Sequence, residues 1–240
     1  MRTFLMVTLV AMGLGGDALA QPDGRPAIEH LTFDVEGHGA MTYAVSVPAE
    51  YDAAEPRPLI LALHPGGSSG AYYGSVNMRR IFEPALRDWR AIVVAPDVPT
   101  RRWTSDISDR GVMALLDHVV RTYAIDRSRV LVTGFSLGGR GTWFFATRHP
   151  DFFTAAIPIA GSPGDDDLAA LGDMPINIIH SRADEVVPFD PAEAAALALE
   201  SAQARVRFTV LEGVGHFSMG GYAPSLREAG DWIREQWDVR

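Results

Sequence analysis

The 240-residue sequence contains no cysteine. A chain without cysteine cannot form disulfides, bind a metal through thiolates, attack a substrate with a thiol or carry a lipid anchor that requires a cysteine. Basic residues are also few, since 21 Lys and Arg stand against 30 Asp and Glu and give a formal net charge of −9. Sequence-independent nucleic-acid binding needs clustered positive charge. We therefore expect no nucleic-acid partner.

Long apolar runs are missing beyond the first 20 residues, so we expect no membrane association of the mature protein. At the start, Arg2 precedes an 11-residue apolar run, Phe4 to Leu14, and the small-x-small sequence Ala18-Leu19-Ala20 follows. This order is typical of a cleaved export signal, and the run is shorter than the roughly 20 apolar residues of a membrane anchor. We expect residues 1–20 to be a signal peptide cut after Ala20, and the mature protein, residues 21–240, to be secreted or periplasmic.

The rest of the chain alternates apolar runs with amphipathic stretches. Two β-rich runs, Leu31–Val35 and Met41–Val47, are joined by Glu36-Gly37-His38-Gly39 and predict an initial hairpin. Six further runs are typical of strands, several of them continuously apolar as in a parallel sheet buried on both faces. These runs are Leu59–Leu63, Ala91–Ala95, Arg129–Thr133, Ala155–Ala160, Ile176–Ile179 and Val206–Leu211.

Helical patterns lie between the runs. Val112, Leu115, Leu116 and Val119 share one face of a helix, and Pro191–Ala202 and Leu226–Trp237 are also helical in pattern. Strands alternating with helices predict right-handed crossovers and a mostly parallel, eight-stranded sheet with helices on both faces. We therefore predict a single α/β domain.

The strongest chemical signal is Gly134-Phe135-Ser136-Leu137-Gly138, directly after a predicted buried strand. In a strand–turn–helix setting this G-x-S-x-G pattern holds a nucleophilic serine on a strained turn, where side chains in place of the glycines would clash with neighbouring backbone. The following helix, about 136–148, directs its positive N-terminal end at the serine. The alternative is a glycine-rich turn with a bystander serine. The setting favours Ser136 as the nucleophile.

A nucleophilic serine needs a base, and for this type of turn the base comes last in the chain. Two histidines follow residue 149. His180 ends a predicted buried strand, where a structural role is expected. His216 lies in the glycine-containing loop Gly213–Phe217, just after the last predicted strand. We predict that His216 is the catalytic base.

The carboxylate that orients the base should come from the loop after the penultimate strand. That loop spans residues 181–188, and Asp184 is the predicted acid. The alternatives are Glu185, one position later, and the triplet Asp165–Asp167 in the preceding loop, for which a solvated turn is the other interpretation.

Two backbone N–H groups should form the oxyanion hole. One belongs to Leu137, the residue after the nucleophile, and the other to the loop that starts at His64. Pro65 has no N–H, so the second donor is Gly66 or a neighbour. We expect His64 to hold this loop in place and not to carry a proton.

These motifs resemble those of the α/β-hydrolase superfamily. Within it, the chain is similar to the small secreted esterases grouped with feruloyl esterases, polyhydroxybutyrate depolymerases and so-called predicted peptidases. The similarity runs from about Tyr43 to the C-terminus. One departure is His64-Pro65, where relatives usually carry His-Gly. The motifs that carry the similarity are Pro58–Gly67, Tyr123–Val130, Gly134–Trp143 with His149-Pro150, Asp184–Pro188 and Gly213–His216.

The resemblance implies the α/β-hydrolase fold, and together with the motifs it predicts a secreted serine hydrolase. Ser136, Asp184 and His216 would cleave carboxylic esters through an acyl-enzyme, with no metal and no organic cofactor. The partner would be a small-molecule or polymer-linked ester. A serine peptidase or amidase of the same fold is one alternative, and a catalytically inactive binding module is another.

Two further expectations concern the substrate. Four aromatic residues, Tyr72, Tyr73, Trp103 and Trp143, are candidate substrate contacts, with ordinary core packing as the alternative. About 15 residues separate the predicted strands that end near Ala160 and begin near Ile176. Such a segment holds about one short helix and no helical lid domain. We therefore expect an open cleft.

Overall fold

The computed structural model describes residues 26–67 and 70–239. The signal peptide predicted for residues 1–20 lies outside these residues. Within the described part of the chain, no helix combines the length and the apolar character that a membrane crossing requires.

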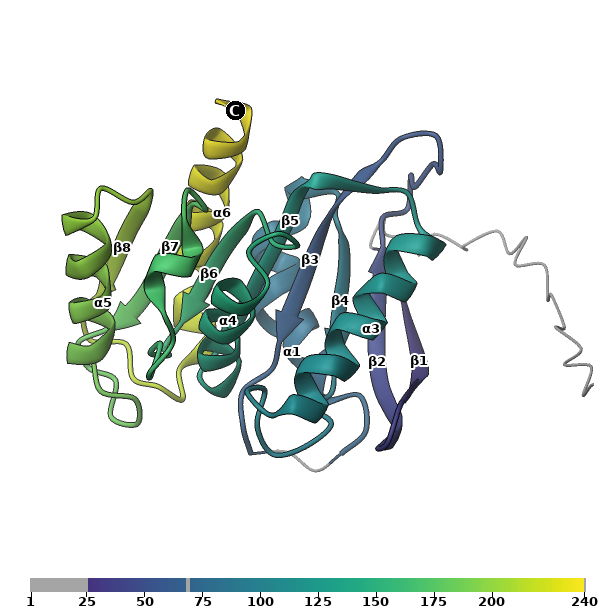
Figure 1. The fold of residues 1–240 in the computed structure, drawn as a ribbon, viewed down its shortest axis with the longest axis horizontal. Helices are drawn as coiled ribbons and strands as arrows, with labels where there is room; N and C mark the ends of the chain where they lie inside the picture. The colour runs from purple at the N-terminus through teal and green to yellow at the C-terminus, as the bar shows by residue number, and fades with distance from the viewer. Residues whose placement is uncertain (1–25, 68–69, 240) are drawn as a thin grey trace, which may run out of the picture.

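The centre of the fold is an eight-stranded sheet in the order β1-β2-β4-β3-β5-β6-β7-β8 (Figure 1). Strand β2 pairs antiparallel with β1 and β4, and every other neighbouring pair is parallel. The prediction of a mostly parallel eight-stranded sheet is confirmed. The strands are β1 (Ala27–Val35), β2 (Gly39–Val47), β3 (Arg57–Leu63), β4 (Ile92–Pro96), β5 (Ile125–Phe135), β6 (Ala155–Ile159), β7 (Ile176–Ser181) and β8 (Val206–Leu211).

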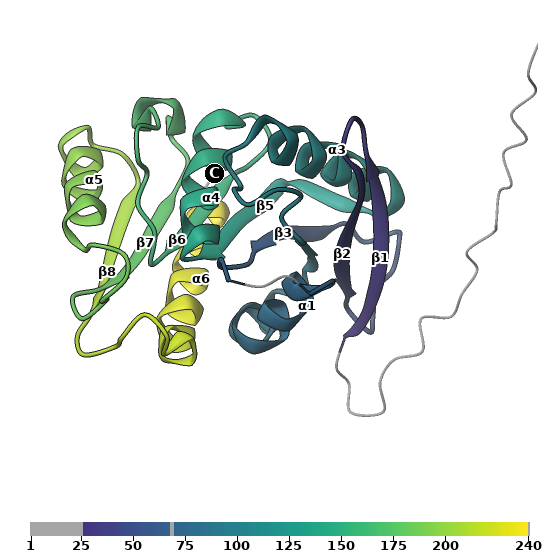
Figure 2. The same ribbon diagram turned by 90° about the horizontal axis from the view of Figure 1, so that it is seen from below.

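Helices cover both faces of the sheet, as predicted (Figure 2). One face carries α3 (Asp106–Thr122), α4 (Leu137–Arg148) and α5 (Asp190–Ser201). The other face carries α6 (Ala223–Asp238) and the irregular helical segment α1 (Tyr73–Asn77), η1 (Met78–Phe82), α2 (Glu83–Leu86) and η2 (Arg87–Trp89). The chain therefore folds into three layers.

Side chains alternate between the two faces along the central strands, so they contribute to two hydrophobic cores, one on each face of the sheet. In β3, Leu59 and Leu61 pack in the core beneath α3, α4 and α5, whereas Ile60 packs in the core beneath η1 and α6. Successive side chains of a strand point to opposite faces, so a strand covered on both sides must be apolar at every position. This explains the continuous apolar runs in the sequence.

The segment from α1 to η2 was not predicted. Its four pieces are each five residues or shorter, and η1 is a π-helical turn. A segment this irregular shows no sustained 3.6-residue period, so periodicity cannot reveal it. Its position depends on burial of Met78, Ile81 and Phe82, whose partners come from distant parts of the chain.

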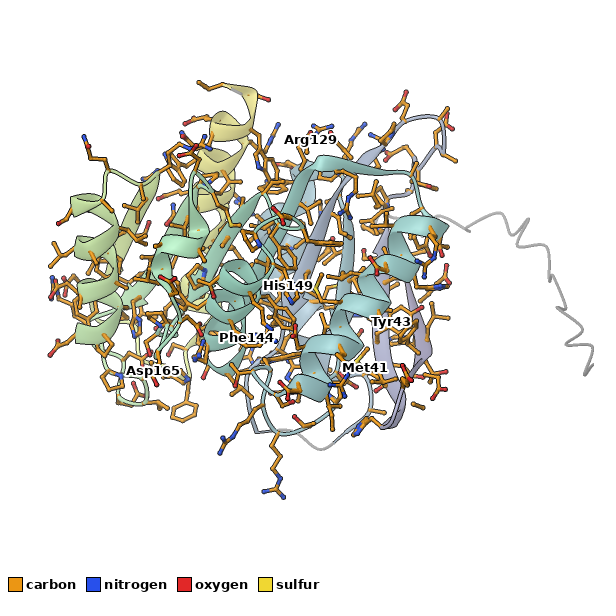
Figure 3. All side chains as sticks on the ribbon, viewed as in Figure 1. Met41, Tyr43, Arg129, Phe144, His149 and Asp165 are labelled. Carbon is orange, nitrogen blue, oxygen red and sulfur yellow. The ribbon has the colours of Figure 1, made fainter. Side chains whose placement is uncertain are left out.

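The carboxyl ends of the parallel strands lie along one edge of the sheet, the lower edge in Figure 1. Figure 3 shows Asp165, in the loop after β6, near this edge and Arg129 near the opposite one. Between β6 and β7, the helical structure is the single 3₁₀ turn η3 (Leu168–Leu171). The prediction of no large lid is confirmed for the segment between β6 and β7, which carries no inserted domain.

Candidate active site

Ser136 occupies a sharp turn between β5 and α4. Its backbone has φ 57° and ψ −114°, a positive-φ conformation that a residue with a side chain rarely adopts. The Ser136 N–H donates to the carbonyl of Ile159 on β6 at 2.9 Å. The turn is thus tied to the neighbouring strand, and Leu137 begins α4 immediately after it.

The glycines around Ser136 are required by close backbone packing. A Cβ placed at Gly134 would lie 2.4 Å from the carbonyl oxygen of Gly138, and one at Gly138 would lie 2.1 Å from that of Leu63. Real Cβ atoms do not approach backbone oxygens so closely. The reason offered for the glycines of the motif therefore holds in the structure.

The structure brings Ser136, His216 and Asp184 together from three different loops. His216 Nε2 lies 2.8 Å from Ser136 Oγ, and His216 Nδ1 lies 2.8 Å from Asp184 Oδ2. An ionised carboxylate only accepts hydrogen bonds, so Nδ1 must carry the proton. The Nε2 lone pair of the neutral ring is then free to accept from the serine hydroxyl.

Asp184 sits in a tight turn after β7. Its Oδ1 accepts from the N–H groups of Val186 and Val187 at 2.9 and 2.8 Å, which leaves Oδ2 for the imidazole. Burial acts to raise the pKa of this carboxyl. Hydrogen bonds from the His216 ring and the two amides outweigh that effect, so the pKa of Asp184 lies below its usual value. The carboxylate is therefore held ionised beside the histidine.

The alternative acids have other partners. Glu185 Oε2 accepts from the main-chain N–H of His216 at 2.9 Å and does not contact its ring nitrogens. Asp166 pairs with the Arg140 guanidinium, and Asp167 Oδ1 accepts from the N–H of Ala169 at the start of η3. Of the candidates, Asp184 is the one within hydrogen-bonding distance of the imidazole.

The other two singled-out histidines are buried and held by main-chain groups. His180 Nε2 donates to the Val187 carbonyl at 3.1 Å. His64 Nε2 accepts from the Val98 N–H at 3.0 Å, and its Nδ1 donates to the Pro65 carbonyl at 2.6 Å. Burial lowers the pKa of both imidazoles, so each is kept neutral.

The two predicted oxyanion donors lie on adjoining segments. Leu137 is the first residue of α4, and its N–H has no acceptor within the helix. Gly66 follows β3, and a Cβ built on it would lie 3.7 Å from Leu137 Cδ2. The N-terminal end of α4 also carries a partial positive charge. The surroundings of Ser136 Oγ therefore suit a developing negative charge.

A cavity of about 420 Å³ opens onto Ser136 and His216. Its walls are mainly apolar, and one charged group, Arg80, reaches it from η1. The lining residues are Pro65, Gly66, Tyr73, Arg80, Phe135, Ser136, Val186, His216, Phe217 and Met219. Phe217 is 77% exposed, so the rim of this cavity presents an unusually bare aromatic side chain.

The four aromatic residues predicted to contact substrate lie in different surroundings, and one of them lines the cavity. Tyr73 lines the cavity, whereas Tyr72 packs edge-on against the His30 ring. The expectation for Trp103 and Trp143 is corrected, because they are 1% and 0% exposed. Their indole N–H groups donate to the carbonyls of His64 and Gly161 at 3.1 and 3.2 Å. Both are core residues that brace the loops around the site.

Several cavity residues were missed in the sequence. Val186 lies two residues after Asp184, and Phe217 lies directly after His216, so their closeness to the motif residues was the available signal. Arg80 and Met219 had no such signal. They reach the cavity because η1 and η4 (Met219–Tyr222) pack against each other on the same side of the sheet.

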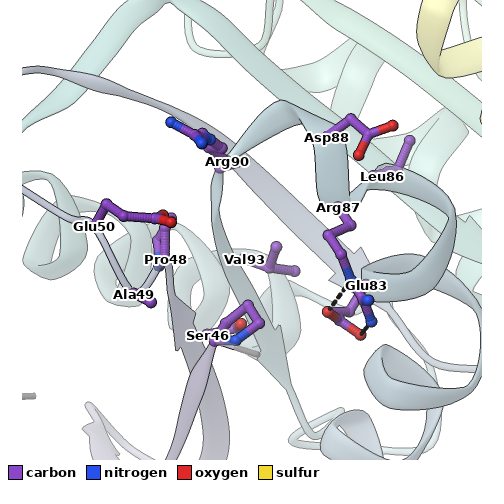
Figure 4. Close-up of a pocket in the computed structure, with 12 residues that line it drawn as sticks. Ser46, Pro48, Ala49, Glu50, Glu83, Leu86, Arg87, Asp88, Arg90 and Val93 are labelled. Atoms are coloured by element: carbon purple, nitrogen blue, oxygen red, sulfur yellow. Dashed lines mark hydrogen bonds and ion pairs between the residues drawn. The ribbon is translucent and has the colours of Figure 1, made fainter. Parts of the chain in front are cut away.

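Outside the Ser136 site, the described residues form further cavities but no cluster of potential metal ligands. No group of three or more metal-ligating side chains occurs in the part of the chain that the structure describes. A second cavity, of about 250 Å³, lies between the end of β2 and the α2–η2 segment and contains the Glu83–Arg87 pair (Figure 4). None of its lining residues belongs to the Ser136 site.

Comparisons with known proteins agree with this geometry. The profile of the dienelactone hydrolase family matches residues 95–225. The protein named "Putative carboxymethylenebutenolidase" of Salmonella typhi is 29% identical over 147 residues, which cover 55% of this chain and 54% of that protein. "Probable feruloyl esterase C" of Aspergillus oryzae (strain ATCC 42149 / RIB 40) is 31% identical over 160 residues, 62% of this chain and 56% of that protein. The chain thus spans about half the length of the curated relatives it matches.

Solved structures show the same architecture. The crystal structure of a thermostable esterase has 26% identity and a TM-score of 0.74 over 87% of this chain and 62% of that one. FphF, a fluorophosphonate-binding serine hydrolase of Staphylococcus aureus, has 16% identity and a TM-score of 0.71 over 88% and 99% of the two chains. The predicted resemblance is confirmed: the chain has the α/β-hydrolase fold and belongs to the dienelactone hydrolase family.

Proposed function

We propose that the protein is a serine hydrolase that cleaves carboxylic esters. The observation that carries the proposal is the chain of two 2.8 Å contacts from Ser136 Oγ through His216 to Asp184. The serine stands on a strained turn at a helix N-terminus and faces an open cavity. This combination is the one that activates a serine for acyl transfer.

The reaction would proceed in two halves. Ser136 Oγ attacks the ester carbonyl carbon while His216 Nε2 takes the hydroxyl proton, and the N–H groups of Leu137 and Gly66 stabilise the oxyanion. The carbon–oxygen bond to the alcohol then breaks, and His216 returns the proton to the departing alkoxide. Water, deprotonated by His216, attacks the acyl carbon, the bond from that carbon to Ser136 Oγ breaks, and His216 returns the proton to Oγ as the acid leaves. These steps require no metal or organic cofactor.

The cavity suggests which esters fit. Its walls include Tyr73, Phe135 and Phe217, which suit an aromatic or other apolar group. Arg80 has no ion-pair or hydrogen-bond partner among the described residues, so a negatively charged group on the substrate could pair with it. The edge without a lid supports access by esters carried on bulky or polymeric molecules.

A fluorophosphonate probe and a substrate panel test this proposal. We expect covalent labelling at Ser136 and hydrolysis of aryl, feruloyl, acetyl-xylan or hydroxybutyrate esters far faster than of matched peptide amides. Faster cleavage of the amides would instead indicate a peptidase. Absence of labelling and of all hydrolysis would indicate a binding module.

Export is a separate part of the proposal. The charged start, apolar run and small-x-small sequence of residues 1–20 support removal of a signal peptide and a secreted or periplasmic mature chain. N-terminal sequencing of protein recovered outside the cytoplasm should begin at Gln21. A full-length chain retained in the cytoplasm would contradict this.

A further inference from the structure

The ring of His216 is buried and packs against that of Phe135, but parts of the loop that carries it have few close neighbours. It follows β8, and a Cβ added at Gly213, or at Gly220 in the η4 turn just after the loop, would meet nothing within 4 Å. Phe217, next to the histidine, is largely exposed. Catalytic geometry nevertheless depends on holding the imidazole to within fractions of an ångström. Polar contacts to the main chain therefore add to the constraint that ring packing supplies.

One such contact reaches the main chain of the histidine. Glu185 Oε2 accepts from the His216 N–H at 2.9 Å, while the preceding residue, Asp184, accepts from the ring Nδ1 at 2.8 Å. Two consecutive side chains of one turn thus hold the same residue at two points. The turn itself is tied by the hydrogen bonds from the amides of Val186 and Val187 to Asp184 Oδ1.

Gly215 gives the Glu185 carboxylate the room to make this contact. A Cβ at Gly215 would lie 3.1 Å from Glu185 Oε2 and 3.5 Å from Oε1. The first distance is tighter than ordinary van der Waals contact, so with an alanine there the carboxylate that accepts from the His216 N–H would have to shift by a few tenths of an ångström. Gly215 does not have a positive φ, so this contact is what a side chain would disturb.

We propose that Glu185 is a positioning residue for the proposed ester hydrolysis. It fixes the backbone of His216, and Asp184 then fixes the ring, so that Nε2 stays aligned with Ser136 Oγ. The role needs a hydrogen-bond acceptor at position 185 and not a negative charge. The inference rests on the proposed function, because it concerns the rate of that reaction.

Substitutions at 185 separate the acceptor from the charge. Glu185→Ala removes the acceptor and should lower kcat on a soluble p-nitrophenyl ester by about tenfold, with KM changed by less than about twofold. Glu185→Gln keeps an amide oxygen that can accept from the His216 N–H. It should retain kcat to within about threefold of wild type.

Gly215→Ala should disturb the contact between Glu185 Oε2 and the His216 N–H by placing a methyl group beside the carboxylate. It should lower kcat by about threefold, and it should add little when combined with Glu185→Ala, because both changes disrupt one contact. Gly220→Ala is the matched control, since its added Cβ meets no neighbour within 4 Å and its φ is not positive. Its kcat should equal that of the wild type.

Deuterium exchange provides a readout independent of turnover. The His216 amide should exchange about tenfold faster in Glu185→Ala than in wild type or Glu185→Gln. Wild-type kcat in Glu185→Ala, or a Glu185→Gln as slow as Glu185→Ala, would overturn the positioning role while leaving ester hydrolysis intact. A wild-type protein that takes up no fluorophosphonate and cleaves no ester would overturn the proposed function and this role with it.

Discussion

The turn that carries Ser136 and the loop that carries His216 are held by different physical means. Around Ser136, Cβ atoms at Gly134, Gly138 and Gly139 would lie 2.1 to 2.4 Å from backbone oxygens. In the His216 loop, an added Cβ at Gly213 would meet nothing within 4 Å, and the nearest atoms to one at Gly215 would be those of the Glu185 side chain. Backbone packing places the serine, whereas the histidine is held by the hydrogen bonds that it donates to Asp184 and Glu185.

This difference separates stability from catalysis. Side chains forced into the serine turn must displace the strands and helix that form the core, so they should affect folding first. Polar substitutions around the histidine leave that packing intact and should affect the reaction alone. Each region can be tested by changes that ought to disturb one property and spare the other.

The largest effect is expected at the serine itself. Ser136→Ala removes the nucleophile, so kcat should fall by about 10⁵-fold and fluorophosphonate labelling should disappear. Alanine has the same backbone preferences as serine here and adds no atoms, so the unfolding midpoint in urea should stay close to wild type. Near-full ester hydrolysis by this variant would refute the assignment of the nucleophile.

The orienting carboxylate should come next. Asp184→Asn presents an amide to His216 Nδ1 and favours the wrong tautomer, so kcat should fall by about 10³- to 10⁴-fold with the fold retained. Asp166→Asn, which alters the Arg140 pair, is the control and should keep kcat within a few fold. If Asp166→Asn were the damaging change, the acid would have to be sought in the loop after β6.

Substitutions at two glycines test whether close backbone packing holds the serine turn. Gly138→Ala should lower the free energy of unfolding by about 3 kcal/mol or more, since its Cβ would lie 2.1 Å from the Leu63 carbonyl oxygen. Gly220→Ala should change it by less than about 0.5 kcal/mol. Urea denaturation measures both. Equal stability of the two variants would show that the serine turn is not held by packing.

The smallest effect concerns pH. Burial lowers the pKa of two imidazoles, that of His64, which follows β3, and that of His180, which lies in β7 before the Asp184 turn. Below about pH 6.5 the unfolded chain therefore binds protons that the folded chain does not, so stability should fall as the pH decreases. His64→Gln keeps an acceptor for the Val98 N–H and removes one titrating group. Its loss of unfolding free energy between pH 7.5 and 5.5, measured with urea, should be smaller than that of wild type. An unchanged loss would assign the pH dependence to other groups.

Much of the fold could be predicted because its signals are local. The apolar runs located all eight strands, with β8 matching at both ends and the others within a few residues, apart from the longer β1 and β5. The face formed by Val112, Leu115 and Val119 located α3. The segment α1–η2 escaped because its short pieces are helical through contacts with distant residues and not through their own pattern.

The sequence by itself located the eight strands and predicted the two-faced burial of the central strands and the triad Ser136, Asp184 and His216. Those conclusions follow from short motifs and from the chain order that the topology requires. Only the tertiary structure decided that Trp103 and Trp143 are core residues, that Arg80 and Phe217 line the cavity, and that Glu185 contacts the His216 main chain. Contacts of this kind join residues far apart in the sequence, and no local pattern records which distant side chains the folded chain brings into contact.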